Sequence, residues 1–299
     1  IIQRYFAGAW ILPPQTPREL YSKKVAENIY ASGTLASLGE LGSGDTKVFT
    51  SELFVGPQSK DDLKAAAEGL SYTVDYGWLT FIASPLFSVL SGIQKAVINW
   101  GLAIILLTIL IKLLFYPLSA ASYKSMAQMR EVAPRLQSMK EKFGDDKQKM
   151  QQAMMELYKT EKINPLGGCL PILVQIPVFI ALYWVLLGSV ELRGAPFLYI
   201  GDLSVPDSLF GTLWFVPLGP LPLLMAASMF LQMKLNPKPT DPMQARLMMM
   251  MPIIFSVFFF FFPSGLVLYW LVNNILSIGQ QWYVNNKIHA EALKKKGNA

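Results

Sequence analysis

The sequence contains one cysteine and one histidine, and only 15% of its 299 residues are charged. The single cysteine, Cys169, excludes a disulfide bond within the chain, and its place in an apolar run is typical of a small buried hydrophobic residue. His289 lies in the polar C-terminal tail, so no histidine is available as a base for a serine nucleophile inside an apolar segment. A Ser-Lys dyad that uses Lys112 remains formally open.

The chain also lacks the motifs of common catalytic and cofactor sites. It has no G-x-x-x-x-G-K-[ST] phosphate-binding loop, no nucleophile elbow and no His or Cys cluster with metal-ligand spacing. We therefore expect a protein that is not an enzyme and that needs no cofactor or metal. The formal net charge of +6 does not predict direct nucleic-acid binding, because the basic residues flank apolar runs instead of forming a polar domain of their own.

Hydrophobic residues make up 53% of the sequence, which includes 18 Phe and 14 Met, and this composition is typical of a membrane protein. Five apolar segments are candidate membrane spans: residues 100–116, 166–190, 213–233, 247–262 and 265–284. The fourth holds sixteen residues, fewer than the roughly 20 that cross a hydrocarbon core of about 30 Å. Prolines interrupt the start of the third. Short spans predict a locally thinned membrane or a partly covered position.

Lysine and arginine are distributed unevenly between these segments. Residues 123–162 carry nine of them, whereas residues 191–212 carry only Arg193. Cytoplasmic loops are richer in Lys and Arg than external ones, so the first of these connections is expected inside and the second outside. The same rule puts the C-terminal tail inside and the N-terminal part outside.

The pattern along the chain predicts several parts. Residues 1–70 have short alternating runs between glycine-rich turns, which indicates the end of a larger β domain. Residues 71–99 contain an amphipathic, aromatic-rich stretch that predicts a helix in the membrane interface, although a half-buried helix of a soluble domain fits the same pattern. Residues 100–284 would form a five-helix transmembrane core. Within it, residues 121–163 would form a cytoplasmic helical hairpin, and residues 285–299 would follow as a basic cytoplasmic tail.

Local signals refine these parts. Ser59 is a plausible N-cap for a short helix that reaches Leu70. Pro85 should kink the helix within residues 71–99 or mark its start. In the hairpin, apolar residues recur every three or four positions on both arms, which predicts a packed seam. The methionines there either fill this seam or contact varied apolar partners.

Lys112 is the only charged residue within residues 100–116. A lysine in the hydrocarbon region costs at least a few kcal/mol, so such a residue usually faces a hydrated cavity or a partner. The alternative is a lysine that snorkels to the near interface from a helix end. Thr108 lies four residues earlier and therefore on the same helical face. Other spans contribute scattered polar residues, each of which could instead join two helices: Gln175, Ser256, Asn273, Asn274 and Ser277.

Several motifs, in order along the chain, resemble those of the bacterial YidC/Oxa membrane protein insertases of the Gram-negative type. They are the run NPLGGC at 164–169 with Pro171, Gln175 and Pro177, the run GSVEL at 188–192, the run TDPMQ at 240–244 and the run FPSGLVLY at 262–269. The resemblance covers roughly residue 72 to the C terminus. Residues 1–70 look like the end of the large periplasmic β domain of that family.

The resemblance implies a membrane α-helical fold in which five helices surround a hydrophilic groove. Lys112 matches a family arginine that makes the groove positive, Thr108 matches a groove threonine, and Trp270 stands where a tyrosine is common. Lysine keeps the charge but loses the planar guanidinium fork. The expected groove residues are Lys112, Thr108, Gln175, Tyr269, Trp270, Asn273 and Ser277, and the apolar path for client helices is expected at Pro171, Ile172, Ile176 and Phe258.

The function expected from this resemblance is insertion and folding of integral membrane proteins without nucleotide hydrolysis. It implies a multi-pass protein of the bacterial inner membrane, with the lipid bilayer and nascent membrane proteins as partners. The Sec translocon and the ribosome are further candidate partners. One alternative is a small-solute or proton-coupled transporter that uses Lys112, but the spans show no evident inverted repeat. A purely structural assembly factor would leave the lysine unexplained.

Overall fold

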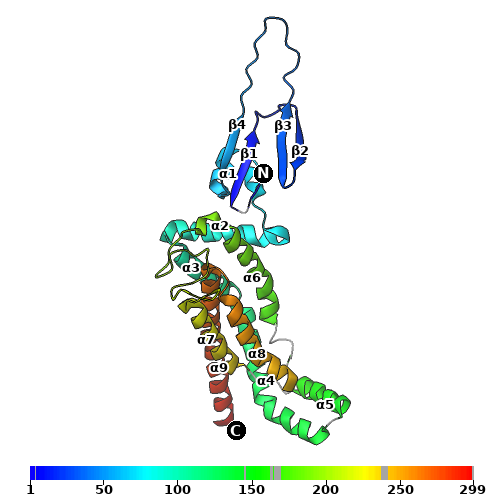
Figure 1. Ribbon diagram of the computed structural model, residues 1–299. Coiled ribbons are helices and arrows are strands. Elements are labelled where there is room, and N and C mark those ends of the chain that lie inside the picture. The colour runs from blue at the N-terminus through cyan, green and yellow to red at the C-terminus, as the bar shows by residue number, and fades with distance from the viewer. Residues whose placement is uncertain (4, 145, 162–163, 165–169, 237–241, 298–299) are drawn as a thin grey trace. The chain divides into compact units, whose positions relative to one another are not determined.

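The computed structural model describes residues 1–3, 5–144, 146–161, 164, 170–236 and 242–297 (Figure 1). The chain divides into two compact units. The N-terminal unit comprises residues 1–77 together with residues 188–191, and the helical unit comprises residues 78–187 and 192–299.

The N-terminal unit contains two antiparallel strand pairs. Strand β1 (Phe6–Ile11) pairs with β4 (Glu52–Pro57), and β2 (Arg18–Ala26) pairs with β3 (Ile29–Ala36). Every residue of β2 is exposed. Two-stranded pairs are marginally stable by themselves, so each pair depends on packing against other parts of the unit.

The short helix α1 (Lys60–Ala66) begins where the sequence predicts. The Ser59 hydroxyl accepts a hydrogen bond from the backbone N–H of Asp62 at 3.2 Å, so Ser59 is confirmed as the N-cap. The predicted end at Leu70 is wrong, because the helix stops at Ala66 and a separate 3₁₀ turn follows.

A partly buried charge cluster lies at the start of α1 within this unit. The Glu191 carboxylate accepts a hydrogen bond from the backbone N–H of Lys60. The Lys60 ammonium lies 5.3 Å from the centre of the Tyr76 ring. Burial raises the pKa of the Glu191 carboxyl and lowers the pKa of the Lys60 ammonium, and each charge partly opposes the shift of the other.

Helix α2 (Thr80–Val97) opens the helical unit and contains Pro85 without being interrupted by it. Its buried residues Ala83, Phe87 and Leu90 recur at intervals of three and four, so one face is buried. The helix ends at Val97, and the C-cap residue Ile98 adopts a left-handed backbone conformation with φ 55°.

Five further helices overlap the apolar segments of the sequence. They are α3 (Trp100–Leu114), α6 (Leu170–Gly188), α7 (Pro220–Leu235), α8 (Pro242–Phe259) and α9 (Ser264–Gly297). Helix α9 packs against α3 and α7, and α7 packs against α8 (Figure 1). The segment expected to begin at Leu213 becomes helical only at Pro220, because residues 212–217 form a small hairpin and proline is favoured in a first helical turn.

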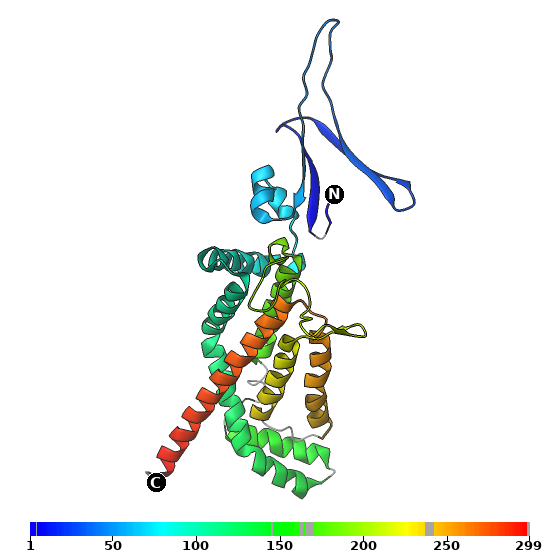
Figure 2. The same cartoon turned by 60° about the vertical axis from the view of Figure 1, so that its left-hand side comes forward.

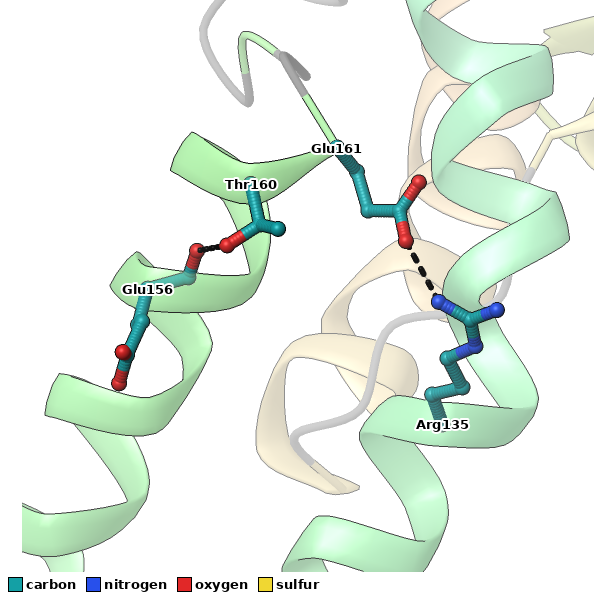
Figure 3. A network of polar contacts seen from close by, with 4 residues as sticks. All are labelled: Arg135, Glu156, Thr160 and Glu161. Carbon is teal, nitrogen blue, oxygen red and sulfur yellow. Dashed lines mark hydrogen bonds and ion pairs between the residues drawn. The ribbon is translucent and has the colours of Figure 1, made fainter.

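Helices α4 (Tyr116–Phe143) and α5 (Lys147–Thr160) pack against each other around Val132, Leu136 and Leu157. Gly144 reverses the chain between them with φ 53°. Figure 3 shows that Arg135 of α4 reaches Glu161 at the end of α5, with Nη1 and Oε1 2.5 Å apart.

The length and apolar composition of each helix determine whether it could cross a membrane as a single helix. Among the described residues, only the helical stretch Gly77–Val97 is both long and apolar enough as a single helix. Helices α3 and α4 meet the same criterion only together, across a bend of 67°. The described apolar parts of α6, α7 and α8 are shorter. At 1.5 Å per residue, such helices suit a hydrocarbon layer thinner than about 30 Å.

The connection from α6 to α7 is fastened to the first turns of α3 and α9. The Phe197 ring lies against Gly101 so closely that a β-carbon there would be 2.1 Å from the ring. The Ser264 hydroxyl donates to the carbonyl of Val205 at 2.7 Å. This connection is therefore a structured part of the helical unit.

Candidate functional site

Helix α9 carries a stripe of polar residues on one face. Tyr269, Asn273 and Ser277 follow one another at intervals of four, and all three are buried. This spacing aligns side chains along one side of a helix. The stripe faces two other apolar helices, α3 and α6, through separate hydrogen bonds.

Lys112 joins this stripe from α3. Its ammonium donates a hydrogen bond to Ser277 Oγ at 2.6 Å, and Ser277 donates in turn to the carbonyl of Asn273 at 2.7 Å. Within the described part of the chain, no carboxylate lies within ion-pair distance of Lys112. The lysine therefore contacts a neighbouring helix through a neutral hydroxyl, and its charge is not neutralised by a described residue.

Thr108 is 1% exposed, and its hydroxyl donates to the carbonyl of Ile104 in its own helix at 2.6 Å. Threonine commonly makes this bond within a helix, and it occupies the hydroxyl proton. The structure thus places Thr108 on the helix that carries Lys112, but its hydroxyl bonds to its own helix and not to the α9 stripe.

Gln175 and Tyr269 connect α6 to α9. Gln175 Nε2 donates to the Tyr269 hydroxyl at 2.5 Å, and Tyr269 is 2% exposed. Trp270 lies beside this pair, with its ring centre 4.8 Å from that of Phe179 and 5.7 Å from that of Phe259. The indole N–H of Trp270 is buried and has no hydrogen-bond partner among the described residues.

Two residues of the expected client path, Ile176 and Phe258, are exposed on the surfaces of α6 and α8. Ile176 of α6 is 46% exposed, and Phe258 of α8 is 55% exposed. The side chains of Pro171 and Ile172 lie outside the described residues.

One residue of the site was missed by sequence reasoning. Tyr123 of α4 is buried, and its hydroxyl is hydrogen-bonded to the Ser277 side chain, so three helices meet at this serine. Tyr123 falls within residues 121–163, the segment that the sequence predicts as a cytoplasmic hairpin. The available signal was the set of small residues Ser119, Ser122 and Ser125, which are buried at intervals of three and allow α4 to approach α9 closely.

Comparison with known proteins identifies the family. Residues 92–291 match the family model described as 60Kd inner membrane protein, and residues 1–89 match the model of the YidC periplasmic domain. The chain belongs to the 60Kd inner membrane protein family. The family resemblance expected from the sequence motifs is therefore confirmed, and the two matches support a fold with a YidC periplasmic domain and a membrane core.

Relatives in this family have been named for their activity. The chain is 64% identical over 300 residues to the membrane protein insertase YidC of Methylobacillus flagellatus, covering 100% of the chain and 53% of that relative. It is 57% identical over 286 residues to the YidC of Polynucleobacter asymbioticus, covering 95% of the chain and 50% of that relative. The chain thus spans about half the length of the curated relatives it matches.

The fold matches a solved member of the family. That structure is titled as an active YidC insertase crystal structure with the first transmembrane domain resolved. The TM-score is 0.59 at 25% sequence identity, and the match covers 94% of this chain and 64% of the other.

Proposed function

We propose that this chain forms the insertion core of a membrane protein insertase, which inserts and helps fold integral membrane proteins without nucleotide hydrolysis. The names of the family relatives support this function. The observation that carries it is the hydrogen bond between Lys112 and Ser277, because it joins a cation that has no carboxylate partner in the described part of the chain to a polar stripe between apolar helices. A transporter is not favoured, since the relatives are named insertases.

The proposed groove lies between α3, α6 and α9. It would be lined by the polar stripe of α9, with Lys112 on one side and Gln175 on the other. Moving a polar client segment into hydrocarbon is costly unless its groups find partners. The stripe would supply some of those partners, and Lys112 would attract acidic client tails where screening is weak.

The apolar part of a client would leave along α6 and α8. The exposed side chains of Ile176 and Phe258 offer an apolar surface on these helices, and Pro171 and Ile172 belong to the same proposed path. Transfer of apolar surface into lipid favours this step by about 25 cal/mol per Å². No enzyme chemistry and no cofactor are needed for it.

The membrane arrangement is part of the same proposal. Residues 100–284 would cross the inner membrane as five helices, with the short helices α6, α7 and α8 in a thinned bilayer. Residues 121–163 and the tail at 285–299 would be cytoplasmic, residues 71–99 interfacial, and residues 1–70 periplasmic. This orientation rests on the Lys and Arg distribution.

The proposed partners follow from the same mechanism. They are nascent membrane proteins and the surrounding bilayer, with the Sec translocon and the ribosome as candidates for client delivery. Direct binding of nucleic acid is not expected, because the basic residues are not gathered on a polar domain.

Reconstitution tests the function directly. The chain would be placed in liposomes and supplied with a client that has one apolar segment and a short translocated tail. We expect the tail to become protected from added protease without nucleotide. Failure of the chain to protect the tail above empty liposomes would overturn the proposal.

A further inference from the structure

The connection between α6 and α7 contains a short hairpin with an apolar surface. Strands β5 (Thr212–Leu213) and β6 (Val216–Pro217) pair antiparallel, and Trp214 and Phe215 form the two-residue turn between them. Figure 2 shows this yellow-green hairpin projecting sideways from the ends of the helices. Its exposed large apolar side chains are Leu209, Phe210, Leu213, Trp214 and Phe215.

Trp214 occupies a backbone position that suits other residues. Its φ is +62°, and it is the first of the two turn residues, where glycine, asparagine and aspartate are favoured. Left-handed backbone is unfavourable for a bulky side chain. The Trp214 side chain is also 91% exposed, so packing within the described chain does not explain its presence. A strained residue with a large exposed ring indicates that the ring acts outside the chain.

The hairpin is nevertheless firmly built. The backbone N–H of Phe210 donates to the carbonyl of Leu218 at 2.9 Å, and the N–H of Leu218 donates to the carbonyl of Gly211 at 2.9 Å. The exposure of the aromatic rings is therefore a property of an ordered turn and not of an unstructured loop.

The apolar surface of the hairpin continues onto the membrane core. The Phe215 ring stacks on the ring of Phe261, beyond the end of α8, with centres 6.3 Å apart and planes at 19°. No charged residue occurs in the sequence between Asp207 and Lys234. A basic or acidic protein partner would find no complementary charge here, whereas aromatic rings without nearby charges suit the boundary between headgroups and acyl chains.

We propose that the β5–β6 hairpin is a lipid anchor, with Trp214 and Phe215 inserted into the headgroup boundary of the bilayer. In the topology proposed above, this is the external leaflet. The anchor would hold the connection between α6 and α7 at a fixed depth while clients move along α8. The depth of the hairpin in the bilayer can be measured whether or not the chain inserts clients. A result that contradicts the anchor is therefore distinguishable from a failure of the proposed function.

The test places an environment-sensitive NBD probe on Cys introduced by Thr212→Cys, in a background where the single cysteine is removed by Cys169→Ser. Thr212 is exposed and adjoins the turn, so Trp214 and Phe215 stay in place. Probes at Lys24→Cys and Ile254→Cys serve as references for exposed sites on β2 and α8. Each protein is reconstituted in liposomes with nitroxide lipids labelled either shallowly or deeply in the acyl chain, and iodide quenching is measured in parallel.

For the Thr212→Cys probe we expect stronger quenching by shallow than by deep nitroxides, and iodide quenching several-fold weaker than for Lys24→Cys. The double variant Trp214→Asn/Phe215→Asn should restore iodide quenching, and asparagine suits the left-handed turn position, so the hairpin should stay folded. Trp214→Tyr should keep the membrane depth. Iodide quenching equal to that of Lys24→Cys would overturn the anchor, and so would shielding from both iodide and nitroxides, which would indicate a covering protein.

Discussion

The carboxylate of Asp207 accepts a hydrogen bond from the backbone N–H of Leu221 at 2.9 Å, in the first turn of α7. The same carboxylate accepts from the Tyr199 hydroxyl at 2.8 Å, and the side chain is 5% exposed. Gly219 allows this approach, because a β-carbon there would lie 2.1 Å from the Asp207 carboxyl carbon. An acidic side chain at a helix N-terminus satisfies free N–H groups and interacts favourably with the helix dipole.

Asp207→Ala should therefore weaken the attachment of the α6–α7 connection. The change leaves buried donors without an acceptor, which costs about 2–4 kcal/mol. Thermal unfolding in detergent should show a clear fall in Tm, with a smaller fall for Tyr199→Phe. Asp202→Ala is the matched control, because Asp202 lies in the same connection and accepts a local hydrogen bond from the backbone N–H of Ser204. Equal effects of Asp207→Ala and Asp202→Ala would contradict a special role for Asp207.

The stability of the packed helices α4 and α5 should depend on their apolar seam and not on the ion pair between Arg135 and Glu161. Leu136 is 7% exposed within this seam, so Leu136→Ala should cost about 2 kcal/mol and open the two helices to protease. Arg135 and Glu161 have 65% and 39% exposed side chains, so Arg135→Ala should cost less than about 1 kcal/mol. Limited proteolysis and Tm measurements would compare the two. A larger effect of Arg135→Ala would show that the ion pair, shown in Figure 3, stabilises the arms.

Much of this architecture follows from local sequence. Apolar runs predict the positions of α3, α6, α8 and α9, and intervals of four predict that Tyr269, Asn273 and Ser277 share a face. The N-cap at Ser59 is equally local. Each of these features depends on helix periodicity or on residues within one turn.

The remaining features depend on contacts between distant segments. The bond from Lys112 to Ser277 joins residues far apart in the chain, so it requires the rotation of two packed helices to be known. The bond from Thr108 to its own helix competes with the expected groove contact, and the sequence cannot decide between them. The β5–β6 turn was missed because Trp214 occupies a position where turn rules favour other residues.

The Glu191 contact with α1 should depend on pH. Burial raises the pKa of this carboxyl, so Glu191 binds a proton more readily when it is packed against α1 than when it is exposed to water. The contact is then fully stable below the ordinary glutamate pKa of about 4.3 and weakens as pH rises through the raised value. Protection of the α1 amides from hydrogen exchange, corrected for intrinsic rates, should decrease over this window in the native sequence.

Glu191→Gln is the control for this pH effect, because it keeps an oxygen acceptor for the Lys60 N–H and cannot ionise. Its α1 protection should be independent of pH over the same range. Parallel pH profiles for Glu191→Gln and the native sequence would assign the effect to another group.

The membrane orientation can be tested by labelling single cysteines in the Cys169→Ser background. The positive-inside rule predicts that Ser138→Cys, in α4, reacts only with reagents that reach the cytoplasm, and Ser208→Cys only with external reagent. Both positions are exposed, so burial should not limit the reaction. External labelling of Ser138→Cys would reverse the proposed topology.

The charge of Lys112 should set which clients are inserted. Lys112→Arg keeps a cation and should retain insertion, whereas Lys112→Glu should lose most of it, because it repels acidic tails and loses the ammonium donor to Ser277. Lys112→Leu should mainly impair clients with acidic translocated tails and spare those with neutral tails.

Ser277→Ala is the matched control: it removes the hydroxyl acceptor but leaves the charge, so it should reduce insertion less than Lys112→Glu. Protease protection of a client series graded by tail charge measures these effects, after each variant's abundance has been equalised. Equal insertion of every client by Lys112→Glu and the native sequence would exclude a role for this charge and favour a lysine that only bridges α3 and α9.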